Sequence, residues 1–231
     1  MLKSLYRALL PPGLRDRVAR ARERAGMIAN YLLARSPSLG VAVRPGTLYI
    51  EGTNICNARC VFCAYPQMER PKVTMPMELF KKVVDEYLAL GLGEIDLTPI
   101  VGDPFVDKHL FERLDYLASR PEVRRFHFYT NAILLKPGYA SRLMGYGERF
   151  WIFCSFGGFD RETYHRVMGV DKFEEAVASI RELIEAKVAA RSTVRLQVNL
   201  RVPKGNEKGE FYEHLLRRRD EGVIGLDGVD D

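Results

Sequence analysis

The sequence has no long hydrophobic run, and this absence excludes two classes of protein. Apolar stretches such as residues 31–34 and 150–154 are far shorter than the roughly 20 residues that a helix needs to cross a bilayer. Near the N-terminus, Pro11 and Pro12 interrupt the apolar residues before they reach the length of a signal-peptide core. We therefore expect neither a membrane span nor secretion, and we predict a cytoplasmic protein.

The sequence also has little excess charge outside its first segment. The net charge of the 231 residues is +5, but residues 1–46 hold nine lysines and arginines against two acidic residues. The rest of the chain is close to neutral and lacks the basic groove that nucleic-acid binding requires, so nucleic acid is not an expected partner.

Within this basic segment, residues 14–35 have the apolar spacing of an amphipathic helix, which predicts a basic helical arm. Two interpretations stay open for the arm. It is either a solvated helix on the outside of the domain, or a segment that docks on an anionic membrane surface or a partner protein.

From residue 47 onward, short apolar segments alternate with longer segments of helical periodicity. This alternation predicts repeated βα units around a parallel sheet. We predict strands at residues 47–53, 94–99, 125–130, 150–155 and 194–201. Helices are predicted at residues 76–90, 108–119, 137–144 and 209–219, with the longest helix between the fourth and fifth strands. Leu79 and Val188 are among the apolar residues predicted to face the core. A short sixth strand at most fits before the end of the chain.

Several predicted strands carry a polar face, which parallel strands covered by helices on both sides do not have. In the fifth strand, Gln197 and Asn199 share one face while Val198 lies on the other. We predict an α/β fold, a partial TIM-like open barrel of five to six βα units with outer helices and a ligand site at the carboxyl ends of its strands. Edge strands whose polar face contacts solvent are the alternative. The expected domains are the arm, residues 1–46, and a core domain, residues 47–231, which we expect to be incomplete at its C-terminal end.

Cysteine is scarce, yet three of the four cysteines lie together directly after the first predicted strand, as Cys56, Cys60 and Cys63. Because no export signal is present, clustered thiols indicate metal or redox chemistry rather than disulfides. A structural zinc site takes four ligands, and no fourth is obvious nearby. A cubane iron–sulfur cluster is normally held by four thiolates, so three thiolates would leave one iron open to a small molecule. The fourth cysteine, Cys154, is expected in the core.

The spacing Cys-x-x-x-Cys-x-aromatic-Cys, with Phe62 at the aromatic position, resembles the signature of the radical S-adenosylmethionine (radical SAM) superfamily. The resemblance covers about residues 47–206. It implies that Cys56, Cys60 and Cys63 hold a [4Fe-4S] cluster and that the open iron chelates S-adenosylmethionine. Within the superfamily, the core is similar to SPASM-type cofactor maturases, although their cysteine-rich C-terminal extension is lacking here.

A second family motif follows the second predicted strand. Residues 101–104, Val-Gly-Asp-Pro, look like the family's Gly-Gly-Glu-Pro segment, in which backbone and carboxylate accept hydrogen bonds from the methionyl ammonium. The resemblance implies cofactor-binding roles for Gly102, Asp103 and Pro104. The shorter carboxylate of Asp103 departs from the pattern, and a simple Gly-Asp-Pro turn is the alternative.

Two more motifs follow the third and fourth predicted strands. Thr-Asn-Ala at residues 130–132 is similar to the family's Thr-Asn-Gly, which implies a cofactor-binding role for Asn131. Ser155 and Arg166 are similar to the serine and arginine that contact the ribose or carboxylate of the cofactor, a task for which a guanidinium is well shaped.

The resemblance implies an enzyme in which one-electron reduction cleaves S-adenosylmethionine and the resulting 5′-deoxyadenosyl radical abstracts hydrogen from a substrate, in chemistry of oxidoreductase or transferase type. It also implies a low-potential electron donor, a ferredoxin or flavodoxin. The substrate is not identified, although a peptide or a cofactor precursor is favoured. Two alternatives stay open: a non-catalytic or truncated protein that binds the cluster or S-adenosylmethionine, and a structural zinc module.

Overall fold

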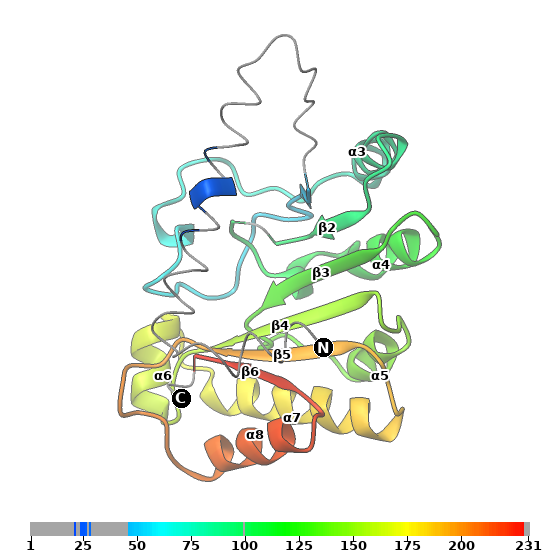
Figure 1. Ribbon diagram of the computed structural model, residues 1–231. Coiled ribbons are helices and arrows are strands. Elements are labelled where there is room, and N and C mark those ends of the chain that lie inside the picture. Colours follow the sequence, from blue (N-terminus) through cyan, green and yellow to red (C-terminus); the bar gives the residue numbers. More distant parts are fainter. Residues whose placement is uncertain (1–20, 22–23, 27, 29–45, 99, 229–231) are drawn as a thin grey trace. The chain divides into compact units, whose positions relative to one another are not determined.

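The computed structural model describes residues 21, 24–26, 28, 46–98 and 100–228. Six strands form one sheet in the order β1-β2-β3-β4-β5-β6, and every neighbouring pair is parallel (Figure 1). The strands are β1 (Leu48–Tyr49), β2 (Glu94–Asp96), β3 (Arg125–Thr130), β4 (Phe150–Phe156), β5 (Arg195–Leu200) and β6 (Gly225–Asp227). Within the described residues, β1 and β6 do not pair with each other, so the sheet is open. The predicted α/β class and partial barrel are confirmed.

Helices connect each strand to the next, as the alternation predicts. They are α3 (Met77–Ala89), α4 (Leu110–Ala118), α5 (Tyr139–Met144), α6 (Arg161–Met168), α7 (Phe173–Ala189) and α8 (Glu210–Asp220), with short 3-10 helices η1 (Tyr65–Gln67) and η2 (Pro104–Val106). Figure 1 shows α7 and α8 along one side of β4, β5 and β6. This arrangement leaves the carboxyl ends of the strands for the loops that carry the predicted motifs.

The core lies between the sheet and these helices. Phe126 and Phe128 of β3 and Phe150 and Ile152 of β4 are completely buried. They share one face because successive side chains of a strand alternate in direction, and the register pairs Phe126 with Phe150, whose rings stack at 5.0 Å. Burying each such side chain contributes about 1.5–3 kcal/mol. The opposite face of the same strands is therefore free for polar residues.

Strand β1 is shorter than the predicted strand at residues 47–53. After Tyr49 and Ile50 the backbone leaves β2 and pairs with residues 73–75 instead. Asn54 N donates to Val73 O at 3.1 Å, and Met75 N donates to Gly52 O at 2.8 Å. This antiparallel pairing ends the parallel strand and fixes the segment that leads into the cysteines.

The connection after β4 holds two helices, α6 and α7, where the sequence predicts one. Asp160 caps α6 by accepting from Thr163 N at 2.8 Å, and Gly169, with φ +67°, ends it. Two residues predicted to face the core are exposed: Leu79 at 47% and Val188 at 41%. Val188 lies in the last turn of α7 and Leu79 borders a surface groove beside β1. Helical spacing alone does not reveal either location.

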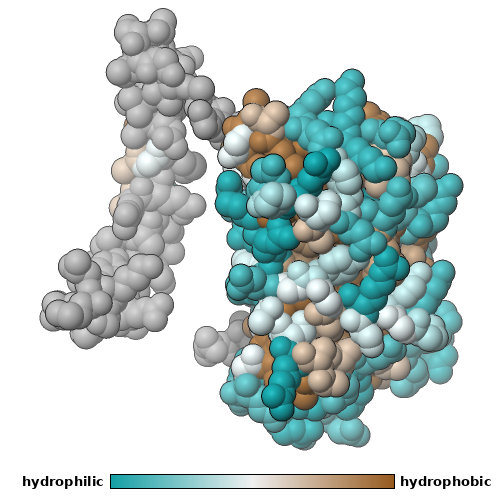
Figure 2. Space-filling view, turned by 90° about the vertical axis from the view of Figure 1, so that its right-hand side faces the viewer, coloured by the Kyte–Doolittle hydropathy of each residue, from teal (hydrophilic) through white to brown (hydrophobic). Residues whose placement is uncertain are grey.

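In the described part of the chain, no helix is long and apolar enough to cross a bilayer. Hydrophilic residues cover most of the face shown in Figure 2, as expected for the outer sides of amphipathic helices. The predicted basic helix at residues 14–35 lies, apart from five residues, outside the described residues. The arm and the domain boundary at residue 46 stay predictions.

Candidate functional site

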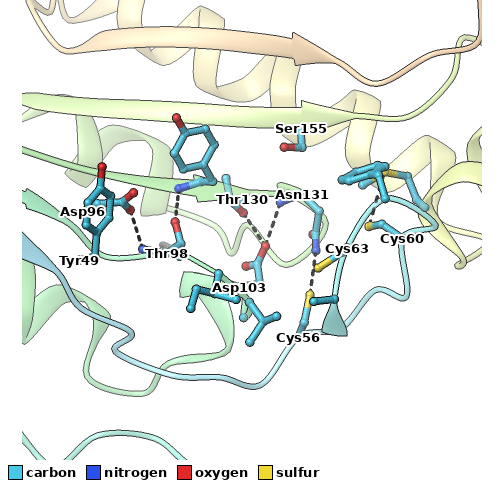
Figure 3. Close-up of a pocket in the computed structure, with 17 residues that line it drawn as sticks. Tyr49, Cys56, Cys60, Cys63, Asp96, Thr98, Asp103, Thr130, Asn131 and Ser155 are labelled. Atoms are coloured by element: carbon cyan, nitrogen blue, oxygen red, sulfur yellow. Dashed lines mark hydrogen bonds between the residues drawn. The ribbon is translucent and has the colours of Figure 1, made fainter. Parts of the chain in front are cut away.

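A cavity of about 480 Å³ lies at the carboxyl ends of the strands, where the fold prediction expects the ligand site. Cys56, Cys60 and Cys63 all line it. Five further predicted site residues line the same cavity: Phe62, Gly102, Asp103, Asn131 and Ser155 (Figure 3). Residues of the loops after β1, β2 and β3 and a residue of β4 therefore meet at one cavity.

The cysteine loop is fixed to the C-terminal end of α6 through its backbone. Arg59 N donates to Met168 O at 3.1 Å, and Val61 N donates to Val167 O at 2.9 Å. Gly169 permits this approach, because a Cβ at this position would lie 2.3 Å from Arg59 O. The last carbonyls of a helix, which lack partners within the helix, thus position the loop that carries the thiols.

Two of the thiols already have hydrogen-bond donors directed at sulfur. Cys56 Sγ accepts from Ala58 N at 3.5 Å and from Asn131 Nδ2 at 3.8 Å, while Cys63 Sγ accepts from Tyr65 N at 3.4 Å. Such donors are the partners that a thiolate ligand of a metal centre requires. In the free thiols, burial raises the pKa of Cys56 to about 11 and that of Cys60 to about 12. The surroundings therefore suit metal-bound thiolates better than free, reactive ones.

The arrangement of the donors bears on whether a single metal ion or a cluster fits the cavity. In the described residues, no group of three or more histidine, cysteine, aspartate or glutamate side chains converges to hold one metal ion. A zinc ion needs its sulfur ligands at about 2.3 Å from one point. In a cubane cluster each thiolate binds a different iron, so the thiols need only surround a common cavity, as these three do. The donor set fits a cluster better than a structural zinc ion.

Gly102 lies where the loop after β2 passes against the loop after β1. Its φ is +101°, a conformation that favours glycine. A Cβ at this position would lie 2.2 Å from Thr53 O, so no other residue fits without movement of the backbone. Close approach of two backbones therefore explains the glycine and leaves room for a ligand beside it.

Asp103 is 1% exposed, and its carboxylate accepts hydrogen bonds from its own segment and from the end of β3 (Figure 3). Oδ1 accepts from Phe105 N at 3.0 Å, and Oδ2 accepts from Thr130 Oγ1 and Asn131 N, each at 2.9 Å. Burial raises the pKa of Asp103, while these donors oppose the shift. The short carboxylate thus joins the loops that follow β2 and β3.

Asn131 connects the β3 loop to the cysteine loop. Its Nδ2 donates to Asn57 Oδ1 at 2.9 Å as well as to the Cys56 sulfur. The next residue, Ala132, has φ +61° and is completely buried. Glycine, which the resemblance leads one to expect there, adopts that conformation with less strain, so Ala132 adopts it at a cost.

A buried ion pair, which no sequence pattern indicates, supports the start of the cysteine loop. Arg113 Nε donates to Asp107 Oδ2 at 2.7 Å, and both side chains are almost fully buried. The guanidinium also donates to the carbonyl oxygens of Gly52 and Met75, which belong to the antiparallel pairing after β1. Removing one member of such a pair leaves a buried, uncompensated charge, so Arg113 holds this loop in place.

Two residues named by the resemblance do not line the cavity. Pro104 is buried at the start of η2, directly behind Asp103. Arg166 is exposed on α6, and its guanidinium lies 3.4 Å from Thr163 Oγ1 of the same helix. Cys154 is completely buried in the core cluster. The motifs therefore also name residues that lie outside the cavity.

The far end of the cavity is lined by residues that the motifs did not include, among them Tyr49, Asp96, Thr98 and Tyr129. They lie on the polar face of β1–β3 and the adjoining loop, since the register pairs Tyr49 with Asp96 and Asp96 with His127. Asp96 Oδ1 accepts from Thr98 N at 2.9 Å, and Asp96 Oδ2 lies 3.4 Å from His127 Nε2. This pair depends on the register of β2 and β3, which the sequence does not reveal.

Comparison with curated proteins finds distant relatives, among them proteins named GTP 3′,8-cyclase. The chain is 23% identical over 160 residues to GTP 3′,8-cyclase of Pasteurella multocida, covering 66% of this chain and 46% of that protein. It is 27% identical over 165 residues to a probable GTP 3′,8-cyclase of Saccharolobus islandicus, covering 71% and 50%. The chain thus spans about half the length of the curated relatives it matches.

Solved structures show the same fold. The chain resembles anSMEcpe with bound AdoMet, with a TM-score of 0.54 and 17% identity over 79% of this chain and 50% of the other. It also resembles Streptococcus suis SuiB bound to the precursor peptide SuiA, with a TM-score of 0.50 and 15% identity over 95% and 55%. The family model for the radical SAM superfamily, whose cofactors are a [4Fe-4S] cluster and S-adenosylmethionine, matches residues 50–201. The chain therefore belongs to the radical SAM superfamily.

Proposed function

We propose that this chain is a radical SAM enzyme in which Cys56, Cys60 and Cys63 hold a [4Fe-4S] cluster. The observation that carries the proposal is the meeting of all three thiols at one cavity, with hydrogen-bond donors already directed at two of them. When bound, the reduced cluster supplies the electron that cleaves S-adenosylmethionine to a 5′-deoxyadenosyl radical. The protein's own residues orient the cofactor and the substrate.

The cofactor end of the cavity would hold S-adenosylmethionine against the open iron. The backbone beside Gly102 is the candidate acceptor for the methionyl ammonium, because the carboxylate of Asp103 already accepts three hydrogen bonds from the protein. Asn131 and Ser155 offer polar groups at the same end, and Phe62 offers a half-exposed ring for packing. Pro104 would act by shaping the loop. Arg166 is not among the proposed cofactor contacts, because it is exposed on α6 and does not line the cavity.

The far end of the cavity would take the substrate, with Asp96 as a carboxylate and Tyr49 and Tyr129 as rings beside it. A buried carboxylate favours a substrate group that donates hydrogen bonds. A peptide or a cofactor precursor stays the favoured substrate class. One solved relative is bound to a precursor peptide, which is a parallel for the peptide class, and the curated relatives in the comparison are named GTP 3′,8-cyclases.

A low-potential donor, a ferredoxin or flavodoxin, is the proposed partner, because iron–sulfur clusters of this kind are reduced only at low potential. A cytoplasmic location is proposed for the same reason, since an oxidising compartment would not preserve the reduced cluster. The basic arm stays a candidate for docking on a membrane or a partner protein.

The test is formation of 5′-deoxyadenosine by the anaerobically reconstituted protein given dithionite and S-adenosylmethionine. We expect product from the native chain and none from Cys60→Ala. The matched control is Cys154→Ala, which removes a thiol from the core and should keep both the cluster and the product. Product from Cys60→Ala at the native rate would contradict the ligand assignment.

A second candidate, binding of the cluster without cleavage of the cofactor, is favoured by one observation. Among the described residues the sheet is open at both edges, and β6 has only three residues. An open sheet shields a radical less well than a closed one. A fully loaded cluster that gives no 5′-deoxyadenosine would favour this second candidate.

A further inference from the structure

An apolar groove of about 1060 Å³ runs along β1, next to the cavity that the cysteines line. We call it the β1 groove. It extends from β1 to the segment at residues 73–76 and the first turns of α3, and most of its lining is apolar, including Ile50, Val73, Met75, Leu79, Val83 and Ile100. The groove therefore lies at one edge of the sheet, outside the set of residues that the family motifs name.

Large apolar side chains gather in this groove and are exposed there. Val73 is 55% exposed, Leu79 47% and Ile100 67%, and Tyr49 is exposed beside them. Single exposed apolar residues are ordinary on a protein surface, whereas several in one hollow mark a binding site. Covering these side chains would remove apolar surface from water, which favours an apolar ligand.

The β1 groove is continuous with the cavity, because Tyr49 and Ile100 line both. Figure 3 shows Tyr49 at the end of the cavity that is away from the cysteines. The cavity holds about 480 Å³, the size of a site for one small molecule, about 300–1,000 Å³. With S-adenosylmethionine at the cysteine end, most of a larger substrate must lie outside the cavity, and the groove begins where the cavity ends.

The backbone beside the groove offers free hydrogen-bonding groups. Ile50 N donates to Asp96 O at 2.9 Å, so Ile50 faces β2. Alternate residues of a parallel strand face opposite neighbours, so the N–H and C=O groups of Tyr49 and Glu51 point to the other side. Among the described residues, β1 is an edge strand with β2 as its neighbour. An extended peptide that adds to such an edge satisfies these groups, as a lipid chain cannot.

The charged side chains that line the groove neutralise each other. Arg70 donates to both carboxylate oxygens of Glu51, at 2.8 and 2.7 Å, and Glu51 also accepts from Val101 N at 3.2 Å. No other described lining residue carries a charge. A phosphate group would find no free cation to bind here. The charge of the groove thus suits an uncharged segment better than a nucleotide.

We propose that the β1 groove binds an extended, apolar segment of a peptide substrate, which pairs with the free edge of β1 and leads the reacting residue past Tyr49 into the cavity. The inference rests on the proposed function, because the reaction itself takes place in the cavity. Side chains at alternate positions of the bound peptide would contact Leu79 and Ile100. The groove thereby selects peptides within the favoured substrate classes.

The probe is a library of random dodecapeptides, displayed on their encoding RNA and selected for binding to the anaerobically reconstituted native chain. Dissociation constants of the selected peptides are then compared between the native chain and Leu79→Asp. Leu79 lies half-exposed in the first turn of α3, so this variant should fold, which its melting temperature checks. The matched control is Val188→Asp, which places the same charge on a residue of similar exposure, 41%, in the last turn of α7.

We expect the selected peptides to carry apolar residues at alternate positions and to bind Val188→Asp as tightly as the native chain. Leu79→Asp should bind them about tenfold more weakly or worse, because the peptide would bury an unpaired carboxylate. Two forms of one selected peptide, N-methylated at its odd or at its even residues, test the pairing with β1. One form should lose at least about tenfold more affinity than the other, since alternate amides face the strand.

Saturating peptide should also change the rate of 5′-deoxyadenosine formation by the native chain, because the bound segment ends where the cavity begins. An unchanged rate would overturn the substrate role of the groove. A selection that enriches no peptide, equal binding to Leu79→Asp, or equal loss in the two N-methylated forms would overturn the inference as well. In each case the proposed function stands if the native chain forms 5′-deoxyadenosine. Peptide binding in the groove of a chain that forms none would instead refute the proposed function, and the substrate role with it.

Discussion

The two ends of the cavity are built in different ways. At the cofactor end, loops after β1, β2 and β3 are joined by backbone contacts: Gly102 against Thr53, and Asp103 against the backbone of Asn131. At the far end, the lining consists of side chains on strand faces, including Tyr49, which is 66% exposed. A cofactor common to a whole family needs a fixed cradle, whereas a substrate end made of side chains can change without altering the backbone. Variants at the two ends should therefore fail differently.

The largest effect is expected from Gly102→Ala at the cofactor end. The new Cβ would lie 2.2 Å from Thr53 O, and the positive φ of +101° adds about 1–2 kcal/mol of strain. We expect loss of several kcal/mol of stability, or no folded protein, measured by chemical denaturation. Gly138→Ala is the control, because its φ is +81° but no atom lies within 4 Å; it should show the backbone strain alone. Equal losses in the two variants would show that the Thr53 contact is unimportant.

The next effect is expected from Asp103→Asn. The amide has one acceptor oxygen where the carboxylate has two, so at least one donor among Phe105 N, Thr130 Oγ1 and Asn131 N loses its partner. The expected destabilisation is about 1–3 kcal/mol, the usual cost of an unsatisfied buried group, with weaker binding of S-adenosylmethionine to the loaded protein. Asp115→Asn, on an exposed residue that bonds Arg142 and Tyr146, should cost less. If Asp103→Asn left the stability unchanged, this would contradict the role of Asp103 in joining the loops that follow β2 and β3.

A smaller effect on cofactor chemistry is expected from Asp96→Asn at the far end. Asp96 contacts Thr98 and His127 and none of the thiols. Cleavage of S-adenosylmethionine without substrate should stay within about twofold of the native rate. Substrate-dependent turnover should fall by the factor that corresponds to the loss of a charged hydrogen bond, about 1.5–3 kcal/mol. The 5′-deoxyadenosine assay measures the first quantity. Loss of this cleavage in Asp96→Asn would show that the two ends of the cavity do not have separate roles.

The smallest effect is expected from Arg166→Ala. The family resemblance assigns this arginine to the cofactor, but its side chain is on the exposed face of α6. Surface substitutions away from a site usually change stability by less than about 0.5 kcal/mol. We expect the dissociation constant for S-adenosylmethionine, measured by equilibrium dialysis, to change less than about twofold, against a larger rise for Asn131→Ala. A tenfold loss in Arg166→Ala would restore the cofactor role.

Much of this molecule can be predicted from local sequence patterns. The alternation of strands and helices follows from hydrophobic periodicity, and the three cysteines are recognisable by spacing because one short loop carries them all. Glycine at 102 follows from a motif at a strand end. These features have in common that the residues responsible are near one another in the sequence.

Features that depend on long-range register could not be predicted in this way. The early end of β1 results from pairing between Thr53 and Thr74, 21 residues apart. The set at the far end of the cavity results from the register of β1, β2 and β3, and the ion pair of Arg113 depends on a contact with Gly52, 61 residues away. The burial of Tyr164 with a hydroxyl that has no hydrogen-bond partner among the described residues is likewise not visible in the sequence.

The most direct test of the proposed centre is electron paramagnetic resonance of the reduced, reconstituted protein before and after addition of S-adenosylmethionine, with iron and sulfide analysis of the same sample. If Cys56, Cys60 and Cys63 hold a cluster with one open iron, we expect about four irons and four sulfides per chain and a spectrum that changes when the cofactor binds. A colourless protein that holds one zinc ion and no sulfide, or a cluster whose spectrum ignores the cofactor, would contradict it.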